Sequence, residues 1–134
     1  MNPGTRKIFD DAVEHKKRGE LQKSKEILQE LSRQNPETAS ILAVLGDVYW
    51  DLKELEEAVG CFRKATLIKP LSETVSLALF HCLWNLGRRN EALDEAKRYL
   101  NHSDSSDYRE MIQEMHDKWV RGTADSGSAS TETN

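Results

Sequence analysis

The sequence predicts an all-α fold, a superhelix of three antiparallel helix pairs followed by a seventh helix that caps the array. Good helix formers dominate the 134 residues, and only three prolines and seven glycines interrupt them. Like residues also recur 34 positions apart, among them Leu45 and Leu79, Ala58 and Ala92, and Pro36 and Pro70. Such a period indicates helix–turn–helix units that stack on one another into a solenoid.

The central unit, residues 39–72, has the clearest pattern. It reads Leu42-x2-Leu45-Gly46-x2-Tyr49, then Ala58-x3-Phe62-x2-Ala65, and closes with Pro70. Gly46 and Ala58 are small where two helices cross closely, and Pro70 ends the second helix because it lacks an N–H. This pattern resembles the tetratricopeptide repeat, with Leu42 in place of the first aromatic residue. The resemblance implies a right-handed array in which the first helix of each pair lines a concave groove.

The flanking units, residues 5–38 and 73–104, follow the same pattern less closely. In the first unit His15 replaces the tyrosine, which suits a terminal repeat whose outer edge faces water. In the third unit Phe80 stands at the position of the glycine and Ala96 at that of the phenylalanine, an exchange that conserves volume. We expect the six helices of these units at about residues 5–18, 21–34, 38–52, 55–68, 72–86 and 90–102.

A seventh helix is expected at residues 107–120. Asp107 and Glu110 form a capping pair, and apolar residues follow at helical spacing on one side: Tyr108, Met111, Ile112, Met115 and Trp119. We interpret this helix as a cap over the open end of the third repeat; the alternative is a detachable helix that folds into the groove. Residues 1–4 and 121–134 are expected to be disordered, so residues 5–120 form a single domain.

Charge and composition exclude several classes of partner. The formal net charge is -4, and residues 1–36 carry eight basic and six acidic side chains, net +2. No basic stripe is present, so we expect no nucleic acid. No segment approaches the ~20 apolar residues of a spanning helix or resembles a signal peptide, which predicts a cytoplasmic protein without membrane insertion. Cys61 and Cys82 lack a C-x-x-C spacing and are predicted to be small core residues; whether they touch stays open.

The resemblance assigns the groove to particular positions of each first helix. Carried over by position, the groove residues are Phe9, Val13, Lys16, Lys17, Ala43, Val44, Asp47, Trp50, Asp51, Leu77, Ala78, His81, Trp84 and Asn85. Trp50 and Trp84 share one position in neighbouring repeats and are the candidate ligand anchors, because large rigid aromatic side chains are favoured in interfaces. The alternative is that they only pack against the next repeat.

The groove does not suit a charged ligand end. Repeat proteins of this family that bind the acidic tails of heat-shock chaperones use a carboxylate clamp of Lys, Asn, Asn, Lys and Arg. The corresponding positions here hold Phe9, Val13, Val44, Thr74 and Ala78. A terminal carboxylate would go unpaired there, so such tails are excluded as ligands. An apolar peptide or one face of an amphipathic helix is expected instead, and the type III secretion chaperones of similar architecture are one candidate class.

Catalysis is not expected. The four histidines are scattered over different helices without metal-ligand spacing, so no metal or other cofactor is predicted. Asp47 and His81 share one groove position in neighbouring repeats, but a nucleophile and an oxyanion site are missing from this pair. The predicted function is therefore an adaptor or chaperone-like protein-interaction module. The alternative is a structural unit that associates with itself into a dimer or longer solenoid.

Overall fold

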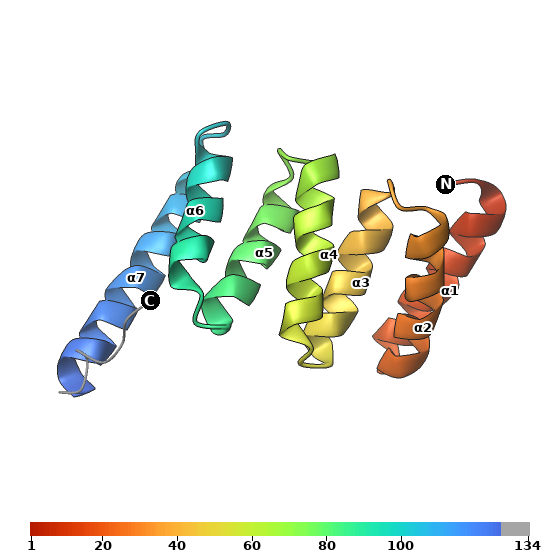
Figure 1. Ribbon diagram of the computed structural model, residues 1–134, viewed down its shortest axis with the longest axis horizontal. Coiled ribbons are helices and arrows are strands. Elements are labelled where there is room, and N and C mark those ends of the chain that lie inside the picture. Colours follow the sequence, from red (N-terminus) through yellow and green to blue (C-terminus); the bar gives the residue numbers. More distant parts are fainter. Residues whose placement is uncertain (127–134) are drawn as a thin grey trace.

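The computed structural model describes residues 1–126, which form seven α-helices and no strand. The helices are α1 (Pro3–Lys17), α2 (Leu21–Gln34), α3 (Ala39–Asp51), α4 (Leu55–Ile68), α5 (Glu73–Asn85), α6 (Arg89–Leu100) and α7 (Ser106–Ser126). Three helix pairs stand side by side in one row, and α7 lies at the end opposite α1 (Figure 1). The predicted all-α superhelix of helix pairs is confirmed.

The first helix begins earlier than predicted. Asn2 caps it, because its Oδ1 accepts a hydrogen bond from the backbone N–H of Thr5 at 2.7 Å. Pro3 follows directly. Proline suits the first helical position, because a backbone N–H there makes no hydrogen bond within the helix. Pro3 and Gly4 are therefore helical, in contrast to the disordered start that the sequence predicts.

The seventh helix ends later than predicted. It runs to Ser126 and not to residue 120. No proline interrupts it, and a single glycine, Gly122, costs a helix interior only about 1 kcal/mol relative to alanine. Residues 121–126 are thus helical and correct the predicted start of the disordered tail; residues 127–134, the rest of that tail, lie outside the described part of the chain.

The turn inside each helix pair uses the same device. Gly19, Lys53 and Gly87 stand at equivalent positions and have positive φ angles of 80°, 65° and 78°. In each turn the N–H of the following residue donates to a carbonyl of the first helix, as from Glu54 to Tyr49 at 2.8 Å. Glycine occupies two of the three turns because it adopts a positive φ without steric cost.

Two clusters of buried side chains form the core. One includes Leu28, Ile41, Leu45 and Val48; the other runs from α3 to α7 and includes Phe62, Phe80, Leu83, Tyr99 and Tyr108. Ala96 is 3% exposed and belongs to the same cluster as Phe80, which is fully buried. Both exchanged residues are thus buried in the core, as the predicted exchange of a large for a small residue requires.

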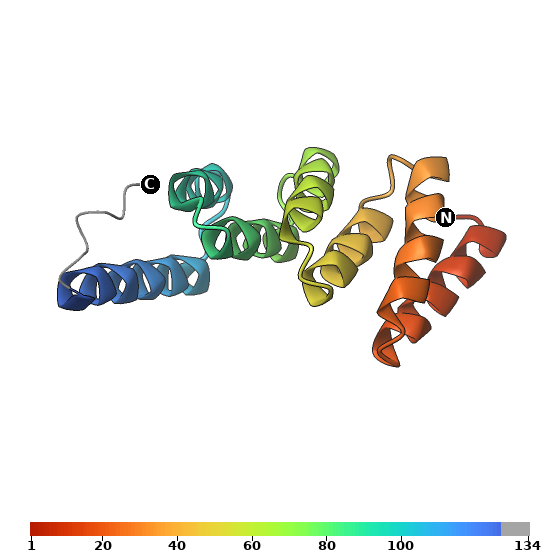
Figure 2. The same ribbon diagram turned by 60° about the horizontal axis from the view of Figure 1, so that its bottom comes forward.

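Tyr108 holds α7 on the third repeat. It is 1% exposed, its ring stacks on that of Tyr99 with centroids 5.4 Å apart, and it meets Phe80 edge-on. Its hydroxyl lies 3.0 Å from Ser76 Oγ, which donates to Glu95 Oε2 at 2.7 Å. Burial raises the pKa of Tyr108 to about 12. From Tyr108 onward, α7 runs away from α6, so its start lies closer to α6 than its end does (Figure 2).

Candidate functional site

A hollow of about 190 Å³ lies between the first helices of the second and third repeats. It is lined by Asp47 and Trp50 of α3, Phe62 of α4, and Ala78 and His81 of α5. Four of these five residues belong to the predicted groove, and Phe62 is a core residue that forms its wall. The hollow, which we call the Trp50 pocket, places apolar surface beside one carboxyl group and one imidazole.

The charges of the Trp50 pocket depend on burial. Desolvation by the surrounding protein atoms raises the pKa of Asp47, although part of its side chain is exposed; Lys16 opposes this shift and Asp51 adds to it. Burial also lowers the pKa of His81, so its imidazole is uncharged at neutral pH. A neutral imidazole has one N–H donor and one acceptor nitrogen. The pocket can therefore bind an apolar side chain and offer hydrogen-bonding groups to a neighbouring peptide bond.

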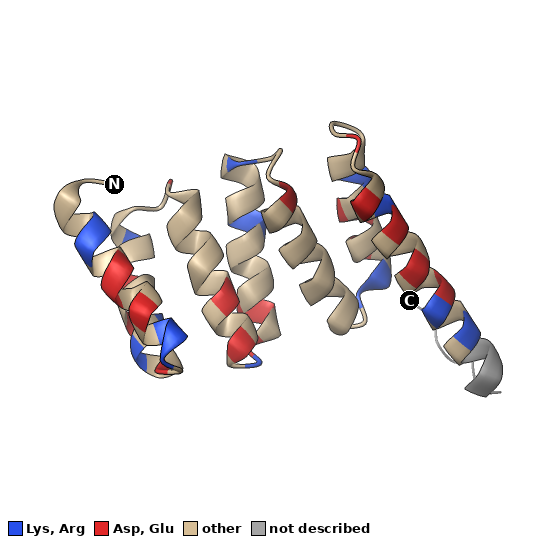
Figure 3. Cartoon of the chain, turned by 180° about the vertical axis from the view of Figure 1, so that it is seen from behind, with Lys and Arg blue, Asp and Glu red and all other residues tan. Residues whose placement is uncertain are grey.

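The helices around the pocket carry few charges. Viewed from behind in Figure 3, α5 is almost free of acidic and basic residues and α3 has them only toward one end, whereas α1 and α7 are strongly charged. Lys16 of α1 forms an ion pair with Asp51 of α3 at 3.6 Å. The first repeat thus adds a charged margin, formed by Lys16 and Asp51, on the side of α3 that faces α1.

The predicted groove residues fall into three classes of exposure. The partly exposed ones are Val13, Lys16, Ala43, Val44, Trp50, Leu77, Ala78 and His81. Lys17, Asp47, Asp51 and Asn85 are exposed, and Phe9 and Trp84 are buried. Asn85 donates from Nδ2 to the backbone carbonyl of His81 at 2.9 Å. The partly exposed apolar residues are thus the ones available for contact with a ligand.

Trp84 lies at the predicted position but presents no free face. It is 8% exposed, because its ring stacks on Phe80 at 5.6 Å and meets Trp119 of α7 edge-on at 6.3 Å. The guanidinium of Arg89 lies 5.2 Å from the ring centroids of both Trp84 and Trp119. In this arrangement the far half of α7 covers the tryptophan, so of the two candidate anchors only Trp50 is open.

Sequence reasoning missed the part that Arg89 and Trp119 have at this end of the groove. The helical spacing placed Trp119 on the apolar side of the seventh helix, which indicated packing but not its neighbour. Arg89 begins α6 and carries no pattern of its own. Its place between two indole rings depends on how α7 crosses α5, and no sequence spacing defines that crossing.

The two cysteines belong to different core clusters. Cys61 lies in the cluster of the first two repeats and Cys82 in the cluster that runs from α3 to α7, and both are free thiols. Burial raises the pKa of Cys61 to about 11 and that of Cys82 to about 12, so neither is an activated nucleophile. Within residues 1–126, no three His, Cys, Asp or Glu side chains are grouped to hold a metal ion. Over the same range no helix has the length and apolar character needed to cross a membrane.

Comparison with known proteins identifies the repeat. Residues 39–70 match the family model of the tetratricopeptide repeat. A comparison with curated protein sequences found no match.

Solved structures of similar fold include those of MamA and of SycD. A crystal structure of MamA superposes with a TM-score of 0.69 at 17% identity over 75% of this chain and 55% of its own. A second MamA structure is 28% identical, with a TM-score of 0.61 over 67% of this chain and 52% of its own. The chain therefore spans a little over half the length of these two MamA structures.

The other is the Yersinia enterocolitica type III secretion chaperone SycD, in complex with a peptide of the translocator YopD. It superposes with a TM-score of 0.73 at 11% identity, over 87% of this chain and 90% of its own. At this identity the likeness shows the fold, here over almost the full length of both chains. The chain therefore contains one repeat, residues 39–70, that matches the tetratricopeptide-repeat model, and its fold is that of solved tetratricopeptide-repeat structures.

Proposed function

We propose that this chain is a protein-interaction module that holds an apolar peptide, or one face of an amphipathic helix, in its concave groove. The Trp50 pocket carries the proposal, since it joins first helices of neighbouring repeats and is lined mainly by apolar atoms. An aromatic wall beside a small hollow suits one apolar side chain of a bound segment. The bound peptide in the SycD structure supports a peptide ligand for this fold.

The proposed ligand enters at the second repeat and not at the third. Trp84 is covered by Trp119, whereas Trp50 is partly exposed. The charged margin formed by Lys16 and Asp51 lies on the side of the first repeat. We therefore expect an apolar anchor in the Trp50 pocket, flanked on one side by polar residues that pair with this margin.

A selection from displayed random 12-residue peptides tests the proposal. Selected sequences should be apolar or amphipathic, and their affinity should fall at least tenfold for the protein with Trp50→Ala. Leu67→Ala is the matched control, because Leu67 is 83% exposed on α4 and lies outside the pocket. Melting temperatures must show that both variants fold. Selection of acidic or polar peptides, or unchanged affinity of the folded Trp50→Ala protein, would contradict the proposal.

Self-association is the second candidate function, and one observation favours it. Ile8 is 47% exposed at the outer end of the first repeat, beside a hollow lined by Ile27 and Leu31. Exposed apolar side chains at a solenoid end can stack on another molecule. Light scattering over a range of concentrations, with wild type and Ile8→Glu, distinguishes this alternative: a monomer at all concentrations excludes it.

A further inference from the structure

Helices α6 and α7 leave an open groove at the C-terminal end of the repeat array. This α6–α7 groove has a volume of about 460 Å³, and its apolar lining consists of Leu93, Ala96, Leu100 and Ile112. Leu93, Leu100 and Ile112 are partly exposed. Within residues 1–126 no helix follows α7 to cover this groove, and α7 is the last helix of the row in Figure 1.

The repeat register shows what such a surface meets elsewhere in the protein. Leu93 of α6 is equivalent to Val59 of α4, 34 residues earlier. Val59 is 4% exposed and lies in the core cluster that contains residues of α5 and α6. The second helix of the central pair, α4, is therefore covered at this position by the next helix pair, α5 and α6. Among the described residues 1–126, α7 is the helix that follows α6 and can cover Leu93.

The repeat register of α7 indicates where the second helix of a fourth pair would lie. Tyr108-x2-Met111-Ile112-x2-Met115 has the spacing of Leu42-x2-Leu45-Gly46-x2-Tyr49 in α3. Ile112 is thus equivalent to Gly46. A Cβ atom built on Gly46 would lie 2.7 Å from the ring of Phe62, so this position faces the second helix of its own pair. Ile112 lines the α6–α7 groove. A second helix paired with α7 would therefore lie in this groove.

The lysine side chain of Lys97 places a positive charge in the α6–α7 groove. Between the second and third repeats, Arg63 of α4 donates from Nη2 to Glu91 Oε1 of α6 at 2.9 Å. Lys97 of α6 is equivalent to Arg63, lines the same groove and has no carboxylate partner within residues 1–126. A carboxylate at the Glu91 position of an incoming helix would pair with Lys97. The groove lining holds two cations, Lys97 and Arg109, and one carboxylate, Asp94, so an acidic residue of an incoming helix suits the position beside Lys97.

We propose that the α6–α7 groove binds an amphipathic helix of a partner protein, which acts as the second helix of a fourth pair. Its pattern is the one that two of the chain's own second helices, α4 and α6, carry: acidic, small, x3, apolar, x2, small or aromatic. In α4 this is Glu57-Ala58-x3-Phe62-x2-Ala65, and in α6 it is Glu91-Ala92-x3-Ala96-x2-Tyr99. This surface is separate from the concave groove and does not depend on the Trp50 pocket.

The probe for this site is a synthetic helix-stapled peptide with the sequence of residues 54–69. Fluorescence anisotropy should show saturable binding to the wild-type protein, and Ile112→Glu should weaken it at least tenfold by placing a charge in the apolar groove. A peptide of the same composition with scrambled order should not bind. Thermal unfolding checks the fold of Ile112→Glu, and Ile112→Ala serves as a milder variant. Absence of saturable binding, or equal binding by the folded Ile112→Glu protein, would overturn the proposal.

A charge exchange makes the geometry specific. Lys97→Glu should weaken binding of the peptide about two- to fivefold, as removal and reversal of one surface ion pair predicts. The peptide with Glu57→Lys should bind Lys97→Glu as tightly as the original pair binds. Trp50→Ala should leave this binding unchanged, which separates the site from the concave groove. Loss of the exchange effect would overturn the proposed register.

A second copy of the chain is the competing occupant, and sedimentation equilibrium distinguishes it. A monomeric wild-type protein supports the partner helix. A dimer that Ile112→Glu dissociates would show that another copy fills the groove, and would overturn the proposal of a partner helix.

Discussion

At the residue scale, Gly46 sets a close approach between α3 and α4. The ring of Phe62 occupies the space where a side chain at this position would begin, 2.7 Å from an added Cβ. Both residues are buried, so neither can move into solvent. Gly60, on the exposed side of α4, has no atom within 4 Å of such a Cβ. A close contact with Phe62 thus requires glycine at position 46, whereas no contact requires it at position 60.

Gly46→Ala should therefore lower the free energy of unfolding by about 1–3 kcal/mol, because an extra methyl group in a packed core forces side chains or backbone to shift. Gly60→Ala should raise it by up to about 1 kcal/mol, because alanine is the better helix former and nothing obstructs it. Urea denaturation followed by circular dichroism measures both changes. Equal effects of the two substitutions would contradict this account of the α3–α4 contact.

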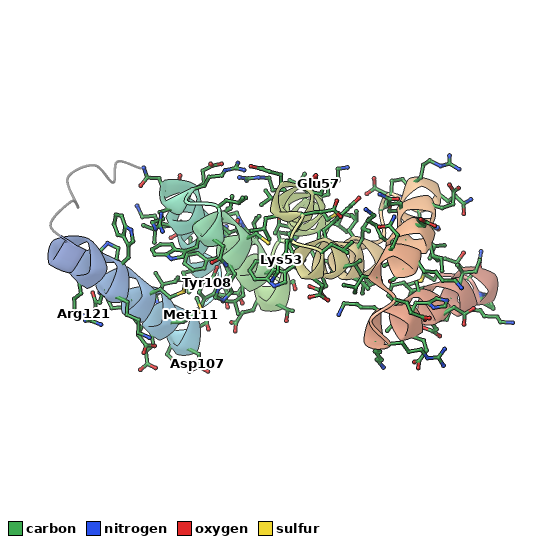
Figure 4. The ribbon with its side chains drawn as sticks, turned by 90° about the horizontal axis from the view of Figure 1, so that it is seen from below. Lys53, Glu57, Asp107, Tyr108, Met111 and Arg121 are labelled. Atoms are coloured by element: carbon green, nitrogen blue, oxygen red, sulfur yellow. The ribbon has the colours of Figure 1, made fainter. Side chains whose placement is uncertain are left out.

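At the element scale, the three helix pairs share one turn, and Lys53 is the exception among its glycines. A side chain in the left-handed region costs about 1–2 kcal/mol relative to a relaxed conformation, because its Cβ approaches the following carbonyl oxygen. Figure 4 labels Lys53 at this turn, where it is exposed and makes no ion pair with the neighbouring helices within the described chain. The strain has no visible compensating contact.

Lys53→Gly is accordingly expected to stabilise the protein by about 1 kcal/mol, the relief of strain exceeding the entropy that a glycine adds to the unfolded chain. Gly87→Ala, at the same turn position in the third repeat, should destabilise it by a similar amount, since the φ of Gly87 is 78°. Melting temperatures and urea midpoints of both variants provide the measurement. A destabilised Lys53→Gly protein would show that the lysine side chain contributes more than the strain costs.

At the scale of the whole molecule, the seventh helix is held at two points. Tyr108 is buried at its start, and Trp119 packs with Arg89 and Trp84 near its end. Figure 4 shows Tyr108 and Arg121 toward opposite ends of α7. The first contact is made by a side chain that is only 1% exposed, whereas the second is made by Trp119, which is partly exposed. The end of α7 should therefore open more easily than its start.

Arg89→Ala tests this difference. Each of the two cation–π contacts contributes about 0.5–1 kcal/mol at a partly exposed site, about 1–2 kcal/mol together, so hydrogen exchange at the amides of residues 113–122 should become about five- to thirtyfold faster. Exchange at the amides of α3 and α4 should stay the same. Mass spectrometry of peptic fragments makes the comparison, with Arg109→Ala as the control on the same end of the molecule. Unchanged exchange in α7 would show that Arg89 does not hold the helix.

Much of the candidate groove could be predicted because the repeat register is periodic. Asp47, Trp50, Ala78 and His81 were assigned by position, and the structure brings these four to one pocket. The exposure of Trp84 could not be predicted in the same way. It depends on Trp119, which lies 35 residues away on a helix whose crossing with α5 has no counterpart in the pattern. Phe9 is buried for a similar reason, since α1 packs against residues of α2 and α3.

The sequence by itself determined the helix pairs, their turns and the phase of the array. These features follow from local chemistry that repeats along the chain: small residues at the crossings, a glycine or its substitute in each turn, and apolar residues at helical spacing. Only the tertiary structure decided which of the predicted groove residues are open and which apolar side chains of α6 and α7 are partly exposed within residues 1–126. Both depend on the path of α7, which leaves Trp50 free, covers Trp84 and exposes the α6–α7 groove, because contacts between distant segments and not local spacing set that path.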